Sequence, residues 1–254
     1  MSYVSVKTLE RLERLRASGV VLVLVTAARL GTLAARLHGL PVADAYLIES
    51  GGRILHFDTE GSPPLGAAPL REDMEWRARF ERHAGLHFEE QTPPAERSGL
   101  VWDCYRRLAG RPGVTIDAGY TTTFRVKGAP EDLERIAAEV ASVGGEEDAL
   151  QCFYNLGMLD VMPRGSGKVN AARYVMERLG ARPEDCVMLC DDQNDLQLAE
   201  YVGRAFVPTI AHPAVEAAAR ARPDHYLLAR VSLLDHALRR CCLSGLSPHW
   251  WHCP

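Results

Sequence analysis

The chain has 254 residues, of which 47% are hydrophobic and 24% charged, and its formal net charge is −4. This is the composition of an ordinary globular protein, and an acidic chain without a basic stripe is not expected to bind nucleic acid. No apolar run approaches the roughly 18 residues that a membrane span needs, and seven scattered cysteines favour reduced, cytoplasmic surroundings over a disulfide framework.

The first fifty residues predict helices that alternate with strands. Residues 8–18 place three leucines on one face opposite charged residues, which is typical of an amphipathic helix. The run "VVLVLV" at 20–25 is apolar on both faces and predicts a buried, central parallel strand. A helix over about 31–39 and a strand over 45–49 follow. This alternation predicts an α/β fold with a doubly wound, Rossmann-like parallel sheet.

An insertion interrupts this pattern. Residues 50–69 are rich in Gly and Pro, and residues 70–150 mix predicted helices and strands in the manner of an α+β cap. Alternation resumes from about 160, with a further buried strand at 184–190. We therefore expect a core domain over 1–60 and 158–245, a cap over 61–157 and a flexible tail over 246–254.

Two segments at predicted strand ends suit phosphate binding. In "LVTAAR", Thr26 and Arg29 follow a strand and precede a helix, and a hydroxyl beside backbone N–H groups can cradle an anion. Thr26 as a simple helix N-cap is the alternative. In "MPRGSGKVNAARYV", Lys168 opens a helix, where a lysine opposes the helix dipole and is expected to face an anion. A solvated surface lysine is the alternative.

A third strand end carries an acidic cluster. In "VMLCDDQNDLQLAE", Asp191 follows the strand and Asp195 lies one helical turn later, with Asn194 between them. Carboxylates that leave room for water suit Mg²⁺, a hard octahedral cation. An Asp N-cap followed by an acidic first turn is the alternative.

In this order, the segments resemble motifs of the haloacid dehalogenase-like (HAD) phosphatases, in the branch with a large α+β cap that includes Cof-type and sucrose-phosphatase-like enzymes. "VTAAR" is similar to the T-G-R segment of the second motif, and "YLIESGGRIL" looks like the turn that leads into the cap. "LDVMPRGSGKVNAARYVMERLG" resembles the third motif, and "CDDQNDLQLAEYVG" the G-D-x-x-N-D motif, with Cys190 where glycine is usual. The resemblance covers about residues 5–230.

The resemblance implies a Mg²⁺-dependent phosphatase whose partner is a small phosphorylated metabolite, a sugar phosphate by cap type. Thr26 would hydrogen-bond the transferring phosphoryl group, Lys168 would hold its charge, and Arg29 would contact the substrate. The implied metal residues are Asp191, Asn194 and Asp195.

The family's nucleophile is missing from its expected place. It lies in D-x-D-G-T at the end of the first strand, whereas the residues before helix 8–18 read "MSYVSVK", and D-x-D occurs nowhere in the sequence. We therefore expect the HAD core to lack its first strand and the chain as written to be inactive. An incomplete or shortened product of an ordinary phosphatase is the favoured explanation. A non-catalytic binding or regulatory pseudophosphatase and a phosphomutase or phosphotransferase stay open.

Other candidates are weaker. Arg125 and Lys127 on the predicted cap strand either reach an anionic sugar or face solvent. The terminal stretch "SPHWWHCP" offers His249, His252 and Cys253 as an incomplete zinc set, and a frayed tail is the simpler interpretation. The vicinal Cys241 and Cys242 are expected to be apolar filling rather than a redox pair.

Overall fold

The computed structural model describes residues 5–57, 70–85, 92–143, 149–190, 192–210 and 212–228. The chain forms two compact units, Met1–Gly180 and Ala181–Pro254. None of the helices in the described ranges combines the length and the apolarity that a membrane crossing requires. The division into core, cap and tail that the sequence suggested stays a prediction.

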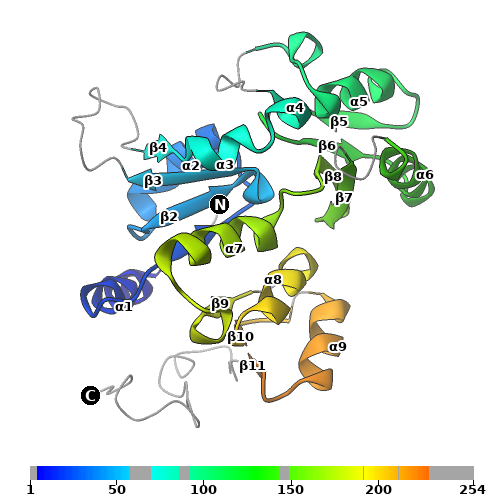
Figure 1. Cartoon of the computed structure of the whole chain (residues 1–254). Coiled ribbons are helices and arrows are strands. Elements are labelled where there is room, and N and C mark those ends of the chain that lie inside the picture. Colours follow the sequence, from blue (N-terminus) through cyan, green and yellow to red (C-terminus); the bar gives the residue numbers. More distant parts are fainter. Residues whose placement is uncertain are drawn as a thin grey trace. The chain divides into compact units, whose positions relative to one another are not determined.

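The first unit begins with a four-stranded sheet in the order β1-β2-β3-β4. β1 and β2 run parallel, whereas β2, β3 and β4 are antiparallel neighbours. The helix α7 runs beside β2 (Figure 1). The bounds are α1 (Val6–Ala17), β1 (Val23–Val25), α2 (Leu30–Arg36), β2 (Ala45–Ile48), β3 (Arg53–Phe57), β4 (Leu70–Glu72), α3 (Met74–Ala78) and α7 (Lys168–Leu179).

The prediction of a buried, central strand over 20–25 is wrong. Only its last three residues, Val23–Val25, form β1, which is the edge of the sheet among the described strands. Val20 and Val21 are 37% and 49% exposed. An apolar, β-branched run favours extended backbone, but its burial depends on neighbouring strands that the run itself does not specify.

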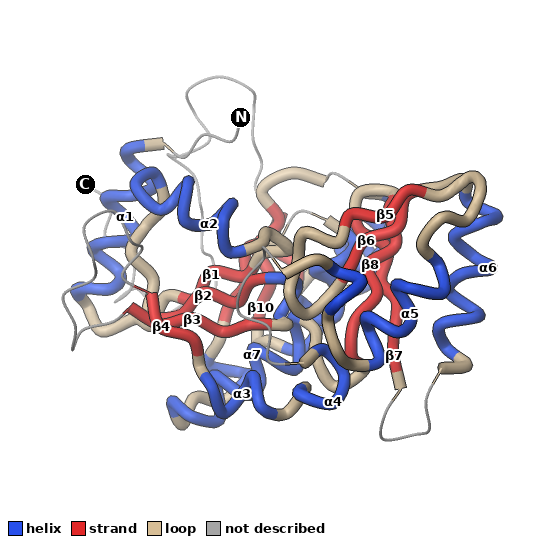
Figure 2. The backbone as a smooth tube through the Cα atoms, turned by 90° about the horizontal axis from the view of Figure 1, so that it is seen from above, coloured by secondary structure: helices blue, strands red, loops and turns tan. Residues whose placement is uncertain are grey.

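A second four-stranded sheet, in the order β5-β6-β8-β7, belongs to the cap region. Figure 2 shows α5 and α6 beside this sheet. Apolar residues of both helices, among them Trp102 and Ile136, form one core with strand residues such as Phe124 and Val161. The bounds are α4 (Glu81–Ala84), α5 (Leu100–Leu108), β5 (Thr115–Asp117), β6 (Phe124–Lys127), α6 (Pro130–Ala141), β7 (Leu150–Asn155) and β8 (Met158–Pro163).

The hairpin of β7 and β8 is an element that the sequence analysis missed. Asn155 pairs with Met158 across a two-residue turn, Leu156-Gly157. Both turn residues have positive φ, 52° and 73°, which is the backbone that tight hairpin turns require. The signal was available, because Gly157 separates two apolar stretches of strand length.

The second unit holds a parallel three-stranded sheet in the order β11-β10-β9. Its apolar core includes Ala199, Ala205 and Val215. The strand predicted at 184–190 is present, but the prediction that it is buried is wrong, because Val187 and Leu189 are 55% and 68% exposed. The bounds are β9 (Val187–Leu189), α8 (Leu196–Tyr201), β10 (Arg204–Val207), α9 (Pro213–Ala221) and β11 (Tyr226–Leu228).

Asp44 fastens α1 to the start of the first sheet. Its carboxylate accepts hydrogen bonds from Nη2 of Arg16 at 2.8 Å and from the backbone N–H of Leu22 at 2.8 Å. The hydrogen bonds from Arg16 are the main reason why the pKa of Asp44 is lowered, and the Leu22 N–H lowers it further. A carboxylate with a lowered pKa stabilises the fold above its unfolded-state pKa of about 3.9 and loses that contribution as the pH falls through the folded-state value.

We expect Asp44→Asn to reduce the free energy of unfolding at pH 7 by about 1 kcal/mol or less, because the pair is partly exposed and screened by solvent. The deficit relative to wild type should shrink as the pH falls below about 3.9 and through the lowered folded-state pKa, since the wild-type carboxylate is progressively protonated over that range. Urea unfolding followed by far-UV circular dichroism at several pH values measures this difference. Glu13→Gln, which removes an exposed charge from the same region, is the control, and a pH-independent deficit would contradict the prediction.

Candidate phosphate-binding site

Thr26 lies in a short loop that connects β1 to α2. Its backbone N–H donates to the carbonyl of Leu47 in β2 at 2.8 Å, which continues the β1–β2 pairing by one residue. Its hydroxyl oxygen accepts from the N–H of Ala28 at 3.1 Å. The interpretation of Thr26 as a helix N-cap is wrong, because α2 begins at Leu30 with Arg29 in the N-cap position.

Lys168 is the first residue of α7, as predicted. Gly167 precedes it in the N-cap position with φ of 110°, a backbone conformation that glycine adopts without strain. Lys168 is half-buried, so it is not a fully solvated surface lysine. A half-buried lysine at a helix start, where backbone N–H groups are not bonded within the helix, favours an anion at this place.

A single turn at Glu49–Gly51, directly after β2, contacts both of these segments. The N–H of Glu49 donates to the carbonyl of Ala28 at 2.9 Å, and the N–H of Ser50 donates to the carbonyl of Thr26 at 3.1 Å. On its other side, a Cβ placed on Gly51 would lie 2.5 Å from the carbonyl carbon of Gly167 and 2.9 Å from the nitrogen of Lys168. The turn therefore brings the Thr26 loop and the start of α7 to one place.

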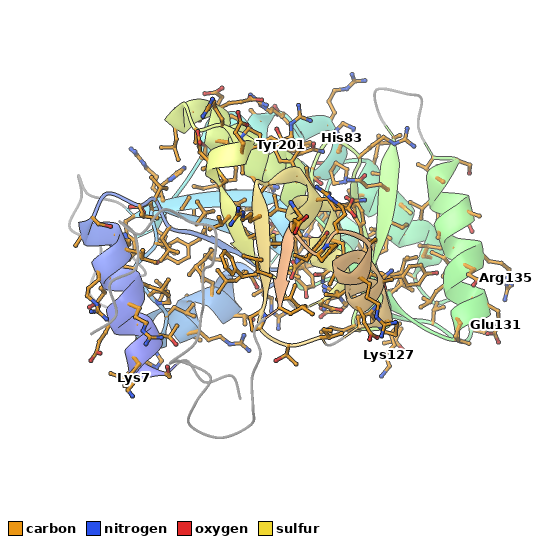
Figure 3. The ribbon with its side chains drawn as sticks, turned by 90° about the horizontal axis from the view of Figure 1, so that it is seen from below. Lys7, His83, Lys127, Glu131, Arg135 and Tyr201 are labelled. Carbon is orange, nitrogen blue, oxygen red and sulfur yellow. The ribbon has the colours of Figure 1, made fainter. Side chains whose placement is uncertain are left out.

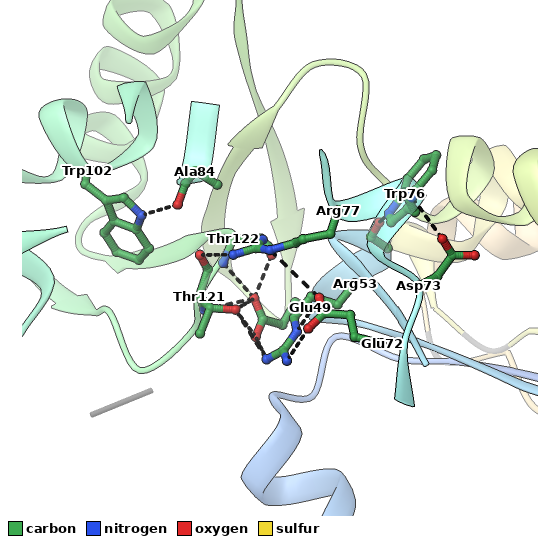
Figure 4. A network of polar contacts seen from close by, with 11 residues as sticks. Glu49, Arg53, Glu72, Asp73, Trp76, Arg77, Ala84, Trp102, Thr121 and Thr122 are labelled. Carbon is green, nitrogen blue, oxygen red and sulfur yellow. Dashed lines mark hydrogen bonds and ion pairs between the residues drawn. The ribbon is translucent and has the colours of Figure 1, made fainter. Parts of the chain in front are cut away.

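A buried charge network lies at this turn (Figure 4). The carboxylate of Glu49, which is fully buried, accepts from the N–H groups of Thr121 and Thr122 at 2.9 and 2.8 Å and from the Thr122 hydroxyl at 2.6 Å. Arg53 lies 3.6 Å from Glu49 and forms a two-pronged pair with Glu72 at 3.0 and 2.7 Å. The sequence analysis missed this network, because a buried acid at a strand end is not distinguishable from an exposed one without its partners.

Arg29 does not point into this turn. Its Nη1 lies 3.9 Å from Oδ1 of Asp117, at the end of β5, and both side chains are largely exposed. A Cβ on Gly119 would meet the same guanidinium nitrogen at 1.9 Å, so Arg29 lies against the loop after β5. The role of Arg29 as a substrate contact stays a prediction.

The acidic cluster belongs to the second unit, and Asp191 lies outside the described residues. Within this cluster, Asp192 is an N-cap residue. It precedes the short helical turn Gln193–Asp195, and its carboxylate accepts a hydrogen bond from the N–H of Gln193 at 2.7 Å. Asn194 and Asp195 are half-buried, and Asp195 immediately precedes α8. Among the described residues, no three His, Cys, Asp or Glu side chains are grouped as a metal ion requires. That these acids share a site with Thr26 and Lys168 stays a prediction.

The two basic residues of β6 differ in their surroundings: Arg125 is paired with a buried carboxylate, and Lys127 is exposed. Arg125 donates to both carboxylate oxygens of Asp160, at 2.5 and 2.9 Å, and Asp160 is 3% exposed. These hydrogen bonds raise the pKa of the Arg125 guanidinium. Lys127, by contrast, is exposed and points away from the cap sheet (Figure 3). The tail residues Cys241, Cys242, His249, His252 and Cys253 lie outside the described residues.

Comparison with known proteins shows which family this chain resembles. The model of the haloacid dehalogenase-like hydrolases matches residues 118–224. The HMP-PP phosphatase of Klebsiella pneumoniae (strain 342) is 25% identical over 222 residues, with 83% of this chain and 79% of that protein covered. The chain is therefore similar to the haloacid dehalogenase-like hydrolases. The family resemblance that the sequence predicted is thus confirmed.

Solved structures confirm the fold class of this chain. The sucrose-phosphatase from Synechocystis sp. PCC6803, whose structure was solved with sucrose and phosphate, is similar with a TM-score of 0.64 and 18% identity, covering 88% of this chain and 84% of that one. A haloacid dehalogenase-like hydrolase from Bacteroides thetaiotaomicron has a TM-score of 0.55 and 15% identity, covering 88% and 87%. The α/β fold with an inserted α+β cap is therefore established.

Proposed function

We propose that this chain carries the phosphate-binding and metal-binding residues of a phosphatase that acts on small phosphorylated metabolites, with sugar phosphates as the favoured class. The observation that carries the proposal is the turn at Glu49–Gly51, which holds the Thr26 loop on one side and the start of α7 on the other. The relatives support the substrate class, since one is an HMP-PP phosphatase and another a sucrose-phosphatase.

Each residue has a role that its chemistry supports. The Thr26 hydroxyl donates to a phosphoryl oxygen, and the Lys168 ammonium group balances the negative charge of the phosphoryl group. N–H groups at the start of α7 add partial positive charge beside Lys168.

Magnesium fits the donor set of the second unit. Asp191, Asp195 and Asn194 would hold Mg²⁺, because carboxylate and amide oxygens with retained waters are the ligands that it prefers. When bound, Mg²⁺ neutralises charge that develops on a transferring phosphoryl group. The residues of this chain would place and orient the ion through the turn that begins at Asp192.

Hydrolysis by the family's chemistry also requires an aspartate nucleophile from a D-x-D segment, which the printed sequence does not contain. The residues above therefore support phosphate and Mg²⁺ binding, and turnover depends on such a segment. Intact mass and N-terminal sequencing of the native protein decide between a phosphatase and a non-catalytic binding protein. A native product with D-x-D supports the phosphatase, whereas a native product without it supports the non-catalytic binding protein.

Binding of inorganic phosphate by the chain, followed by isothermal titration calorimetry in the presence of Mg²⁺, tests the proposal directly. We expect Lys168→Ala and Thr26→Val each to weaken phosphate binding by about tenfold or more, because each removes a hydrogen bond to a charged group. Lys127→Ala, which removes an exposed lysine of β6, should leave the affinity unchanged. Equal losses in the Lys127 and Lys168 variants would show that only general charge attraction is at work.

A further inference from the structure

The turn at Glu49–Gly51 adopts a backbone that its own sequence disfavours. Glu49 and Ser50 have φ of 51° and 57°, and neither is glycine. Residues with a Cβ avoid this left-handed region unless surrounding contacts hold them there. Contacts with other segments must therefore stabilise this backbone conformation, because the local sequence does not favour it.

The side chain of Glu49 provides those contacts. Its carboxylate is fully buried and accepts two backbone N–H groups and two hydroxyl groups, all from Thr121 and Thr122. A buried carboxylate is stable only when its oxygens are hydrogen-bonded or paired, and here Arg53, 3.6 Å away, supplies the opposite charge. The chain that leads into β6 thus holds Glu49 in place.

The backbone of the same turn holds the two predicted phosphate ligands. Ser50 donates to the carbonyl of Thr26 at 3.1 Å. Gly51 lies so close to Gly167 and Lys168 that no side chain fits between them. The indole N–H of Trp76 donates to the carbonyl of Gly51 at 3.1 Å and holds the turn from a further direction. Any movement of Glu49 is therefore passed to the Thr26 loop and to the start of α7.

We infer that Glu49 is the positioning residue of the phosphate site: its bonds to Thr121 and Thr122 set the distance between the Thr26 hydroxyl and the Lys168 ammonium group. The inference rests on the proposed function for its consequence, weaker phosphate binding, but its structural part stands on the contacts of the turn alone. Glu49 touches no phosphate in this scheme. It acts through the backbone of Ser50 and Gly51.

Two substitutions of the full chain test the inference. Glu49→Gln keeps the size of the side chain but removes its charge and replaces one acceptor oxygen with an NH₂ donor. Because both N–H groups donate to Oε2, that NH₂ group would take the place of Oε1 and face the guanidinium group of Arg53 and the hydroxyl of Thr121. Thr122→Val removes the 2.6 Å hydroxyl bond with little change in shape and serves where Glu49→Gln does not fold. Asp160→Asn is the matched control, because it alters another buried carboxylate, one that pairs with Arg125 of β6 instead of with the turn.

The first readout is hydrogen exchange of the amides of Glu49, Ser50 and Thr26, measured by NMR. We expect exchange to rise by about tenfold in Glu49→Gln, and less in Thr122→Val, because local opening of the turn becomes easier. Asp160→Asn should leave these three amides at the wild-type rate. Unchanged exchange in a folded Glu49→Gln or Thr122→Val, or an equal rise in Asp160→Asn, would overturn the inference.

The second readout is calorimetric binding of inorganic phosphate to the same variants. We expect about a fivefold loss of affinity in Glu49→Gln, the effect of one weakened hydrogen bond, and none in Asp160→Asn. Wild-type affinity in a folded Glu49→Gln would overturn the positioning role. If the wild-type chain itself binds no phosphate, the proposed function fails, and the exchange rates alone decide the role of Glu49.

Discussion

Replacing Trp102 with alanine is expected to lower the free energy of unfolding by about 3–5 kcal/mol, the usual cost of truncating a large buried aromatic side chain. Trp102 is fully buried in the core that joins α5 and α6 to the cap sheet. The guanidinium carbon of Arg97 lies 4.4 Å from the centre of its ring. The indole N–H donates to the carbonyl of Ala84 at 3.0 Å. The variant therefore loses apolar contacts, a cation–π contact and a hydrogen bond together.

Chemical denaturation followed by far-UV circular dichroism measures this loss. Trp102→Phe separates its parts, because phenylalanine keeps an aromatic ring in the core but cannot donate to Ala84. We expect that variant to lose about 1–2 kcal/mol, the cost of an unpaired buried carbonyl and a small change in volume. A loss below about 1 kcal/mol in Trp102→Ala would mean that the cap core closes around the missing ring far more completely than cores usually do.

The second large effect is expected at Gly51. In Gly51→Ala the new Cβ would lie 2.5 Å from backbone atoms of Gly167, and the residue has φ of 92°. Both the clash and the backbone conformation oppose any side chain. We expect a loss of about 3–4 kcal/mol in the free energy of unfolding, together with loss of phosphate binding, because the start of α7 must move.

Gly180→Ala is the control for Gly51→Ala. Gly180 ends α7 with φ of 64°, and a Cβ there would meet nothing within 4 Å. Only the left-handed backbone penalty applies, so we expect a loss of about 1–2 kcal/mol. Denaturation of the two variants under the same conditions measures the difference. Equal losses would show that the approach of Gly51 to Gly167 is loose enough to admit a methyl group.

Local sequence predicted which helices and strands form better than it predicted which of their residues are buried. Along α7, helical periodicity predicts an inward-facing set of apolar residues: Ala171, Ala172, Val175, Met176 and Leu179. Ala171, Ala172 and Val175 are buried, but Leu179 is 53% exposed. Tyr174, not predicted, is buried and donates to Asp73 at 3.1 Å. Periodicity predicts which face of a helix is apolar. Whether the last turn of that face is buried depends on segments that are distant in the sequence.

The same limit applies to the candidate site. Thr26 and Lys168 were recognised because a strand end and a helix start carry local signals. Glu49 was not, because its partners Thr121 and Thr122 are 72 and 73 residues away in sequence. Likewise, Arg125 was interpreted as a possible sugar contact, whereas two of its five N–H donors bond to the buried Asp160. Pairings between distant residues decide such roles.

The approach of Gly51 to Gly167 has a consequence for how this chain tolerates insertions and deletions. Those two residues are in backbone contact, so residues 52–166 form a closed loop whose ends are fixed to each other. The entropic cost of closing a loop grows only with the logarithm of its length, at about 0.6 kcal/mol for each doubling. Gaining or losing a hairpin inside this loop would therefore change the cost of closure very little. The segment is free to vary in size while the two glycines keep its ends together.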